Sequence, residues 1–217
     1  MSSTEENYLK AIFKILEKEE KGAGTNAIAT AMNTTAASAT DMIKRLAEKE
    51  LVAYEKYRGV QLTDKGNTLA TALIRKHRLW EVFLTEKLHF AWDEVHEMAE
   101  QLEHIRGEHL ISRLDQFLGY PRFDPHGDPI PDEEGRWNYR PQELLSKLLP
   151  GQKGLVTGVN EHSPAFLQHL NQKGIALGTL IEVVEQFEFD HSIQIKIQDK
   201  ELIISDKVSK QLWVSRN

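Results

Sequence analysis

The sequence predicts a mainly α protein with a small β domain at its C-terminal end, and three observations support this. Apolar residues recur at helical spacing through most of residues 4–118. A proline-rich stretch without periodicity follows at 119–141. From residue 151 onward the pattern changes to that of strands, as where Ile193, Ile195 and Ile197 alternate with polar residues. The 217 residues suit two or three compact units.

The N-terminal region predicts three helices followed by a hairpin. Apolar spacing indicates helices over 4–20, 25–32 and 36–49, and strand-like runs over 51–57 and 60–62 flank a turn. This order is that of a winged helix-turn-helix, in which one helix enters the major groove of DNA and a second helix braces it. The alternative is a helical bundle with a hairpin that binds no DNA.

The third predicted helix and the hairpin would supply the DNA contacts. Small hydroxyl side chains allow a close approach to phosphates and bases, and lysine and arginine neutralise phosphates. An aspartate in such a helix can accept a hydrogen bond from a cytosine amino group. The candidate DNA-binding residues are Thr35, Ala37, Ser38, Asp41, Lys44 and Arg45 on the helix, and Lys56 and Arg58 on the hairpin.

The charge distribution is compatible with this prediction, although the net charge of −6 mildly disfavours nucleic acid. Residues 1–70 carry 10 Lys+Arg and 10 Asp+Glu and are therefore neutral. Residues 93–108 carry six acidic residues against one Arg, so the acidic charge is concentrated away from the predicted DNA-binding segment.

A second group of residues predicts a metal site in the middle of the chain. A long helix is expected over 64–87, and two more between 92 and 118 with a break near Arg106-Gly107. On the middle helix, four side chains at offsets 0, 4, 7 and 8 fall within an arc of about 100°. These are His96, Glu100, Glu103 and His104, and the long helix adds the i, i+4 pair His77 and Glu81.

The ligand chemistry favours Mn²⁺ or Fe²⁺. The chain has no cysteine, so disulfides and thiolate ligands are excluded and any metal must be held by nitrogen and oxygen. Solvated helix faces are the structural alternative, and a hydrolytic metal site remains open at this point. The sequence also has no apolar run of ~20 residues and no signal peptide at Met1, so we expect a cytoplasmic protein without membrane contact.

The sequence resembles the diphtheria toxin repressor family, which includes iron-dependent repressors and manganese transport regulators. The resemblance covers essentially the whole chain. It rests on the segments Glu6–Ile12, Tyr54–Gly66, Arg75–Glu81, Val95-His96, Leu102–His104 and Pro125–Pro131, which are specific only in combination.

The resemblance implies a winged helix-turn-helix at 1–66, a metal-binding and dimerisation domain at 67–141, a linker at 142–150 and an SH3-like (FeoA-like) barrel at 151–217. It also implies a primary metal site and an ancillary one. The primary ligands map onto Asn7, Glu100, Glu103 and His104, and the ancillary ligands onto His77, Glu81 and His96.

The sequence departs from the family pattern at two positions around the primary site, Asn7 and Lys10. Iron-type members have Met where Asn7 stands and Cys where Glu100 stands, and manganese-type members have Asp and Glu there. Glu100 is thus manganese-like, whereas Asn7 matches neither type. Lys10 stands where manganese-type members place a further carboxylate, so their binuclear site does not carry over.

The resemblance implies a metal-activated regulator, most simply a homodimeric repressor of metal-ion uptake that binds a palindromic DNA operator. Metal bridging the first helix to the dimerisation domain would favour the DNA-binding arrangement. Two other functions are weighed: a metallohydrolase that uses the His and Glu faces, and a metal-sensing accessory protein without DNA binding. The sequence has no H-E-x-x-H motif.

Overall fold

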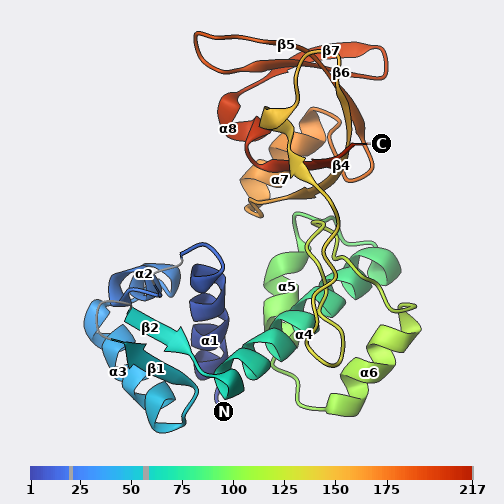
Figure 1. Cartoon of the computed structure of the whole chain (residues 1–217). Helices are drawn as coiled ribbons and strands as arrows, with labels where there is room; N and C mark the ends of the chain where they lie inside the picture. The colour runs from blue at the N-terminus through green and yellow to red at the C-terminus, as the bar shows by residue number, and fades with distance from the viewer. Residues whose placement is uncertain (20–21, 56–58, 217) are drawn as a thin grey trace. The chain divides into compact units, whose positions relative to one another are not determined.

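The computed structural model describes residues 1–19, 22–55 and 59–216, and the chain divides into two compact units (Figure 1). Each unit has a hydrophobic core of its own. The long helix α4 (Asp64–Leu88) contributes residues to both units. The first unit comprises Met1–Trp80, Glu100–Arg113 and Pro131–Trp137, and the second comprises Glu81–Ala99, Leu114–Ile130 and Asn138–Asn217.

The first unit contains the predicted three helices and hairpin, which confirms this part of the fold class. Its strands pair antiparallel, with Val52 opposite Leu62. The elements are α1 (Ser3–Leu16), α2 (Thr25–Ala31), α3 (Ala36–Glu48), β1 (Val52–Glu55) and β2 (Gly59–Leu62). Of the predicted DNA-binding residues, Lys56 and Arg58 lie outside the described residues.

Helix α1 is fixed firmly to the other helices and the hairpin of the first unit. It begins with a capping box, in which the Ser2 hydroxyl accepts from the Glu5 amide and the Glu5 carboxylate accepts from the Ser2 amide. Leu9 and Ile12 are fully buried in the core of the first unit, which also holds Leu46 of α3. Because the core is closely packed, a displacement of α1 would also move α3, the helix predicted to contact DNA.

Two shorter helices follow α4, as predicted. Helix α5 (Val95–Leu102) and helix α6 (Glu108–Phe117) are separated at Gly107, whose φ of +147° is a backbone conformation that suits glycine. Residues 119–141 form an irregular segment, with one isolated bridge between Phe123 and Pro129. Within the described ranges, no helix has the length and apolar character needed to cross a bilayer.

The second unit contains the predicted β domain. In the described part of the chain its strands form one sheet in the order β3-β8-β4-β5-β6-β7, with antiparallel neighbours throughout. Helices α7 (Pro164–Gln172) and α8 (Asp206–Ser209) accompany it. The strands are β3 (Glu143–Leu144), β4 (Lys153–Val159), β5 (Leu180–Gln186), β6 (Ile193–Ile197), β7 (Lys200–Ile204) and β8 (Leu212–Ser215).

The predicted linker over 142–150 differs from the structure. Strand β3 pairs with β8, and a 3₁₀ turn, η1 (Leu145–Lys147), follows it directly. Leu145 and Leu148 are fully buried in the same core as the strands of the β domain. The segment was misread because a two-residue strand has no periodicity to detect, and the β domain in fact begins before residue 151.

The β domain is closely joined to the irregular segment within the second unit. The Val159 amide donates to the His126 carbonyl at 3.0 Å, and the Trp92 side chain packs against the β-domain core. Gly127 has a φ of +89°, and a Cβ there would lie 2.0 Å from the Thr157 carbonyl oxygen. Only glycine permits this approach, which holds His126 in place.

The burial of Leu145 predicts a large loss of stability on truncation. We expect Leu145→Ala to lower the free energy of unfolding of the β domain by about 2–5 kcal/mol, because a fully buried leucine leaves a cavity. Leu149→Ala is the matched control: its side chain is 59% exposed, so we expect a change of about 0.5 kcal/mol or less. Urea denaturation of the full chain measures both, and equal effects would mean that 142–150 is a linker after all.

Candidate metal centre

The first group of predicted ligands is assembled within the first unit from α1, α4 and the turn that follows α5. Asn7 lies on α1, His77 on α4 and Glu100 in the last turn of α5. The sequence placed Glu103 and His104 on a helix, but α5 ends at Leu102 and both residues lie in the turn directly after it. The turn still directs both side chains toward α1, where Glu103 contacts Lys10 and His104 contacts Glu6.

Glu103 is the centre of this group. Its side chain is fully buried, and each of its oxygens lies 2.7 Å from Lys10 Nζ. His77 Nδ1 lies 2.6 Å from Glu103 Oε2. Burial disfavours the charged form of the carboxyl, but the hydrogen bond to His77 and the charge of Lys10 more than offset burial and hold the pKa of Glu103 below its ordinary value. Glu103 is therefore held as a carboxylate, and both of its oxygens already contact the Lys10 ammonium.

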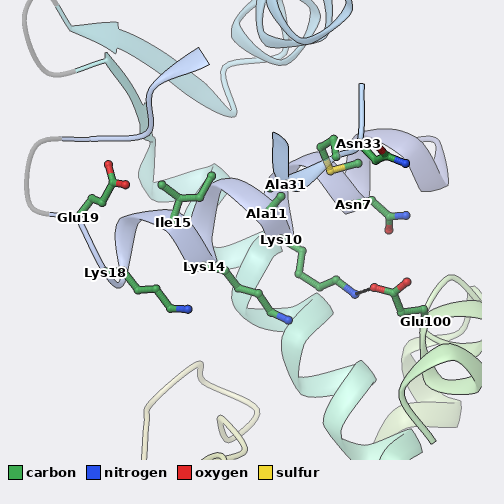
Figure 2. A pocket seen from close by; sticks show the side chains of 11 residues that line it. Asn7, Lys10, Ala11, Lys14, Ile15, Lys18, Glu19, Ala31, Asn33 and Glu100 are labelled. Atoms are coloured by element: carbon green, nitrogen blue, oxygen red, sulfur yellow. Dashed lines mark hydrogen bonds and ion pairs between the residues drawn. The ribbon is translucent and has the colours of Figure 1, made fainter. Parts of the chain in front are cut away.

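Asn7 and Glu100 lie beside this carboxylate. Glu100 Oε1 is 3.2 Å from Lys10 Nζ, and Figure 2 shows Asn7, Lys10 and Glu100 at the wall of one cavity. The Asn7 Oδ1 atom is buried, and no donor in the described part of the chain hydrogen bonds to it. A buried hydrogen-bond acceptor without a donor destabilises the folded state. The Asn7 oxygen is therefore well suited to coordinate a metal ion.

His104 is oriented by a residue that the sequence analysis missed. Its Nδ1 atom lies 2.6 Å from Glu6 Oε2, on the face of α1 that also carries Asn7. The contact leaves Nε2 directed toward Glu103, at 3.9 Å from Glu103 Oε1. A carboxylate that fixes one imidazole nitrogen and leaves the other for a metal is a common arrangement. The only indication of this contact in the sequence is that Glu6 directly precedes the predicted ligand Asn7.

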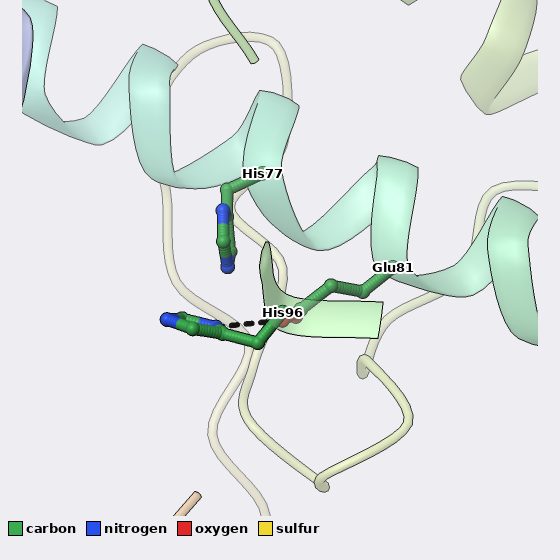
Figure 3. Close-up of side chains that lie close together, drawn as sticks. All are labelled: His77, Glu81 and His96. Atoms are coloured by element: carbon green, nitrogen blue, oxygen red, sulfur yellow. Dashed lines mark hydrogen bonds and ion pairs between the residues drawn. The ribbon is translucent and has the colours of Figure 1, made fainter. Parts of the chain in front are cut away.

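Two of the predicted ancillary ligands are in contact within the second unit. His96 Nδ1 of α5 lies 3.2 Å from Glu81 Oε1 of α4, the contact that the dashed line marks in Figure 3. The third predicted ancillary ligand, His77, lies one turn before Glu81 on α4 and belongs to the first unit, where it contacts Glu103.

A further group, of Glu81, Asp124 and His126, was not predicted. All three are buried in the second unit and offer ligand atoms within 4.8 Å of one another. Asp124 Oδ1 accepts from the amides of His126 and Asp128, at 2.8 and 3.0 Å. The Pro125–Pro131 segment was noted as part of the resemblance, but no helical spacing relates it to Glu81, and only the fold brings the two together.

The His126 ring has one nitrogen bound and one directed at Glu81. Nε2 lies 2.8 Å from the Trp92 carbonyl oxygen, so this nitrogen carries a proton, and Nδ1 is 3.8 Å from Glu81 Oε2, too far for a hydrogen bond. Burial of the ring lowers its pKa, but Glu81 and Asp124 outweigh burial and raise the pKa of His126 to about 9. The ring of His162 stacks on that of His126 at 4.7 Å, and its partial burial lowers the pKa of His162 to about 4.

The predicted DNA-binding residues on α3 are exposed. The Thr35 hydroxyl caps α3 by accepting from the Ser38 amide at 3.2 Å, and it donates to the Ser38 hydroxyl at 3.0 Å. Asp41 lies 3.5 Å from Lys44 Nζ, so part of the charge of that lysine is neutralised on the protein. Ala37 and Arg45 lie on the same exposed helix.

Together these groups can hold divalent cations with nitrogen and oxygen ligands from α1, α4, α5 and the irregular segment. A metal that contacts Asn7 and Glu103 would join α1, and the helices and hairpin it packs against, to the turn after α5. Hydrolysis would in addition require an open coordination position and a nucleophile or general base.

Comparison with known protein families gives three matches that together cover most of the chain. Residues 1–60 match the family "Iron dependent repressor, N-terminal DNA binding domain". Residues 63–132 match "Iron dependent repressor, metal binding and dimerisation domain", and residues 144–216 match "FeoA domain".

Individual relatives are similar over different lengths. The chain is 34% identical to the diphtheria toxin repressor of Corynebacterium diphtheriae over 222 residues, which cover 97% of this chain and 96% of that protein. The alignment with the diphtheria toxin repressor of Corynebacterium jeikeium is shorter: it covers 67% of this chain and 62% of that protein, at 34% identity. The alignment with the iron-dependent repressor IdeR of Mycobacterium tuberculosis covers 59% of this chain and 55% of that protein, also at 34% identity. The chain thus spans less than two thirds of the length of several curated relatives.

Solved structures are similar over the whole chain. A manganese-dependent transcriptional repressor in complex with manganese superimposes with a TM-score of 0.87 at 33% identity, covering 98% of this chain and all of that one. The manganese regulator SloR superimposes with a TM-score of 0.79 at 32% identity, covering both chains completely.

The raised pKa of His126 predicts pH-dependent metal binding at its group. Because the ring is mostly protonated at pH 7, a metal that binds His126 must displace a proton, so affinity should rise about tenfold per pH unit between pH 7 and 8.5. We expect Mn²⁺ titrations of the full chain to contain one class of sites with this slope. His126→Gln should abolish that class, and a slope that survives this substitution would contradict the assignment.

Proposed function

The chain belongs to the iron-dependent repressor family that includes the diphtheria toxin repressor, and on that premise we propose that it is a metal-activated, DNA-binding transcriptional regulator. Its effector is Mn²⁺ or Fe²⁺. The observation that carries the proposal is the buried Asn7 oxygen without a donor, next to the ionised Glu103, on a helix that belongs to the DNA-binding fold.

The residues present fit such a metal. The ligand set contains carboxylate, amide and imidazole groups and no thiolate, which suits Mn²⁺ and Fe²⁺ more than softer ions. We assign Asn7, Glu100, Glu103 and His104 to a primary site. We assign Glu81 and His96 to a second site, and we add Asp124 and His126 to it. The metal supplies positive charge that draws these ligands together.

The regulated step is DNA binding. Metal that holds Asn7 near Glu103 and His104 restricts α1, and α1 shares a core with α3. A metal that prefers this arrangement favours the DNA-binding state, and DNA must tighten metal binding by the same factor. We propose that α3 enters the major groove, with Thr35, Ala37, Ser38 and Asp41 near the bases and Lys44 and Arg45 near phosphates.

The wider biological setting follows from the family. The match to a metal-binding and dimerisation domain supports a homodimer, and a symmetric pair of reading heads suits a palindromic operator. We propose that the protein represses genes of metal-ion uptake and works in the cytoplasm, where its operator lies. We further propose domain limits of 1–66 and 67–141, with the β domain starting at the β3 strand.

The two alternatives account for less of the molecule. A metallohydrolase leaves the helix-turn-helix and hairpin unexplained, and the relatives named above are repressors or regulators. An accessory protein without DNA binding likewise leaves the exposed hydroxyl and basic side chains of α3 without a role. A measurement of DNA binding with and without metal therefore distinguishes the three hypotheses.

The proposal predicts a metal-dependent gel shift. Purified protein should shift a fragment of its own upstream region with Mn²⁺ or Fe²⁺ present, and a chelator should reverse the shift. Glu103→Gln should require at least about tenfold more metal, because a charged ligand is lost from a site without thiolates. Glu97→Gln, an exposed position on α5, removes the same charge and should behave as the parent. Equal binding with and without metal would rule out the switch.

A further inference from the structure

Lys10 lies where the metal ligands converge. Its ammonium is within 2.7 Å of both Glu103 oxygens and 3.2 Å from Glu100 Oε1, so it contacts two of the proposed primary ligands at once. Lys10 is 5% exposed, and buried lysines are rare unless paired. The spacing on α1 places Lys10 almost one turn after Asn7, on the same side of the helix.

We propose that Lys10 is the internal counter-cation of the primary site, which a divalent metal must displace from Glu103, so that Lys10 sets the affinity of the site for metal. This inference rests on the proposed function. It goes beyond that function because it assigns the tuning of metal affinity to a residue that is itself no ligand.

The contacts of Glu103 require such a displacement. Oε2 is shared between Lys10 and His77, and Oε1 is bound by Lys10, with His104 Nε2 at 3.9 Å. A metal ion that coordinates either oxygen would lie in contact with the ammonium, and two cations cannot share that position without strong repulsion. The ammonium must therefore release at least one oxygen when metal binds.

The structure offers a place for the displaced side chain. A cavity of about 480 Å³ borders Lys10, Asn7 and Glu100, and Figure 2 shows Lys10 reaching along its wall toward Glu100. The Glu100 side chain is 44% exposed, so an ammonium that moves toward it regains contact with water. The positive charge nevertheless stays near the site, and it lowers the affinity for a divalent ion even after the movement.

Substitution of Lys10 tests this directly. We expect Lys10→Met to lower the Kd for Mn²⁺ at least about tenfold at pH 7.5, measured against a competing chelator dye, because two carboxylates lose their nearest cation. The metal-free variant should also have a lower Tm, because Glu103 remains buried without that partner. Lys14→Met is the matched control, since Lys14 lines the same cavity on the same helix, and its Kd should stay within about twofold of the parent.

Each outcome decides between defined alternatives. A Kd for Lys10→Met that is unchanged or larger overturns the inference, and so does an equal decrease in Lys14→Met, which would indicate a general charge effect. If Glu103→Gln binds Mn²⁺ as the parent does, the proposed primary site itself fails. Should Lys10→Met not fold without metal, Lys10→Gln removes the charge but keeps a donor for Glu103, and the same comparison applies.

Discussion

The structure of the first unit depends on one constraint: the Glu103 carboxylate is fully buried and ionised, so it must be paired. Its partners come from α1, through Lys10, and from α4, through His77. A single carboxylate therefore joins the DNA-binding fold, the long helix and the turn after α5. Removing either partner would leave the buried charge with less compensation, so contacts to Glu103 hold these three distant segments together. A second contact between α1 and this turn, from Glu6 to His104, supports the same junction.

This junction is the physical route by which the proposed metal site would act on DNA binding. In the proposed mechanism, a divalent ion that binds Glu103 would replace a protein cation with one of higher charge at the same place, so binding would change the forces on α1 without creating a new interface. Helix α1 cannot move independently of α3, because Leu9 and Leu46 belong to one close-packed core. The second group of ligands, around Glu81 and His126, is built differently: the β domain holds it, through the Val159 amide and the Trp92 ring. The two groups can therefore respond to metal through different parts of the chain.

Much of the fold could be predicted from the sequence because periodicity records it. The helices over 36–48 and 64–88 and the break near Gly107 follow from apolar spacing and glycine. The close approach of Glu103 and His104 was also predictable, since they are neighbours in the chain. Lys10 as their partner, and Asp124 with His126 as partners of Glu81, were not, because these contacts join segments that no local pattern relates. The buried Leu145 was missed for the same reason.

Anomalous diffraction from crystals of the Mn²⁺-loaded protein tests the central claim most directly. We expect a manganese peak at ligand distance from Asn7, Glu103 and His104, with the Lys10 ammonium no longer in contact with both Glu103 oxygens. A peak confined to the group of Glu81, Asp124 and His126, with the Lys10–Glu103 pair intact, would contradict it, because metal would then have no direct contact with α1.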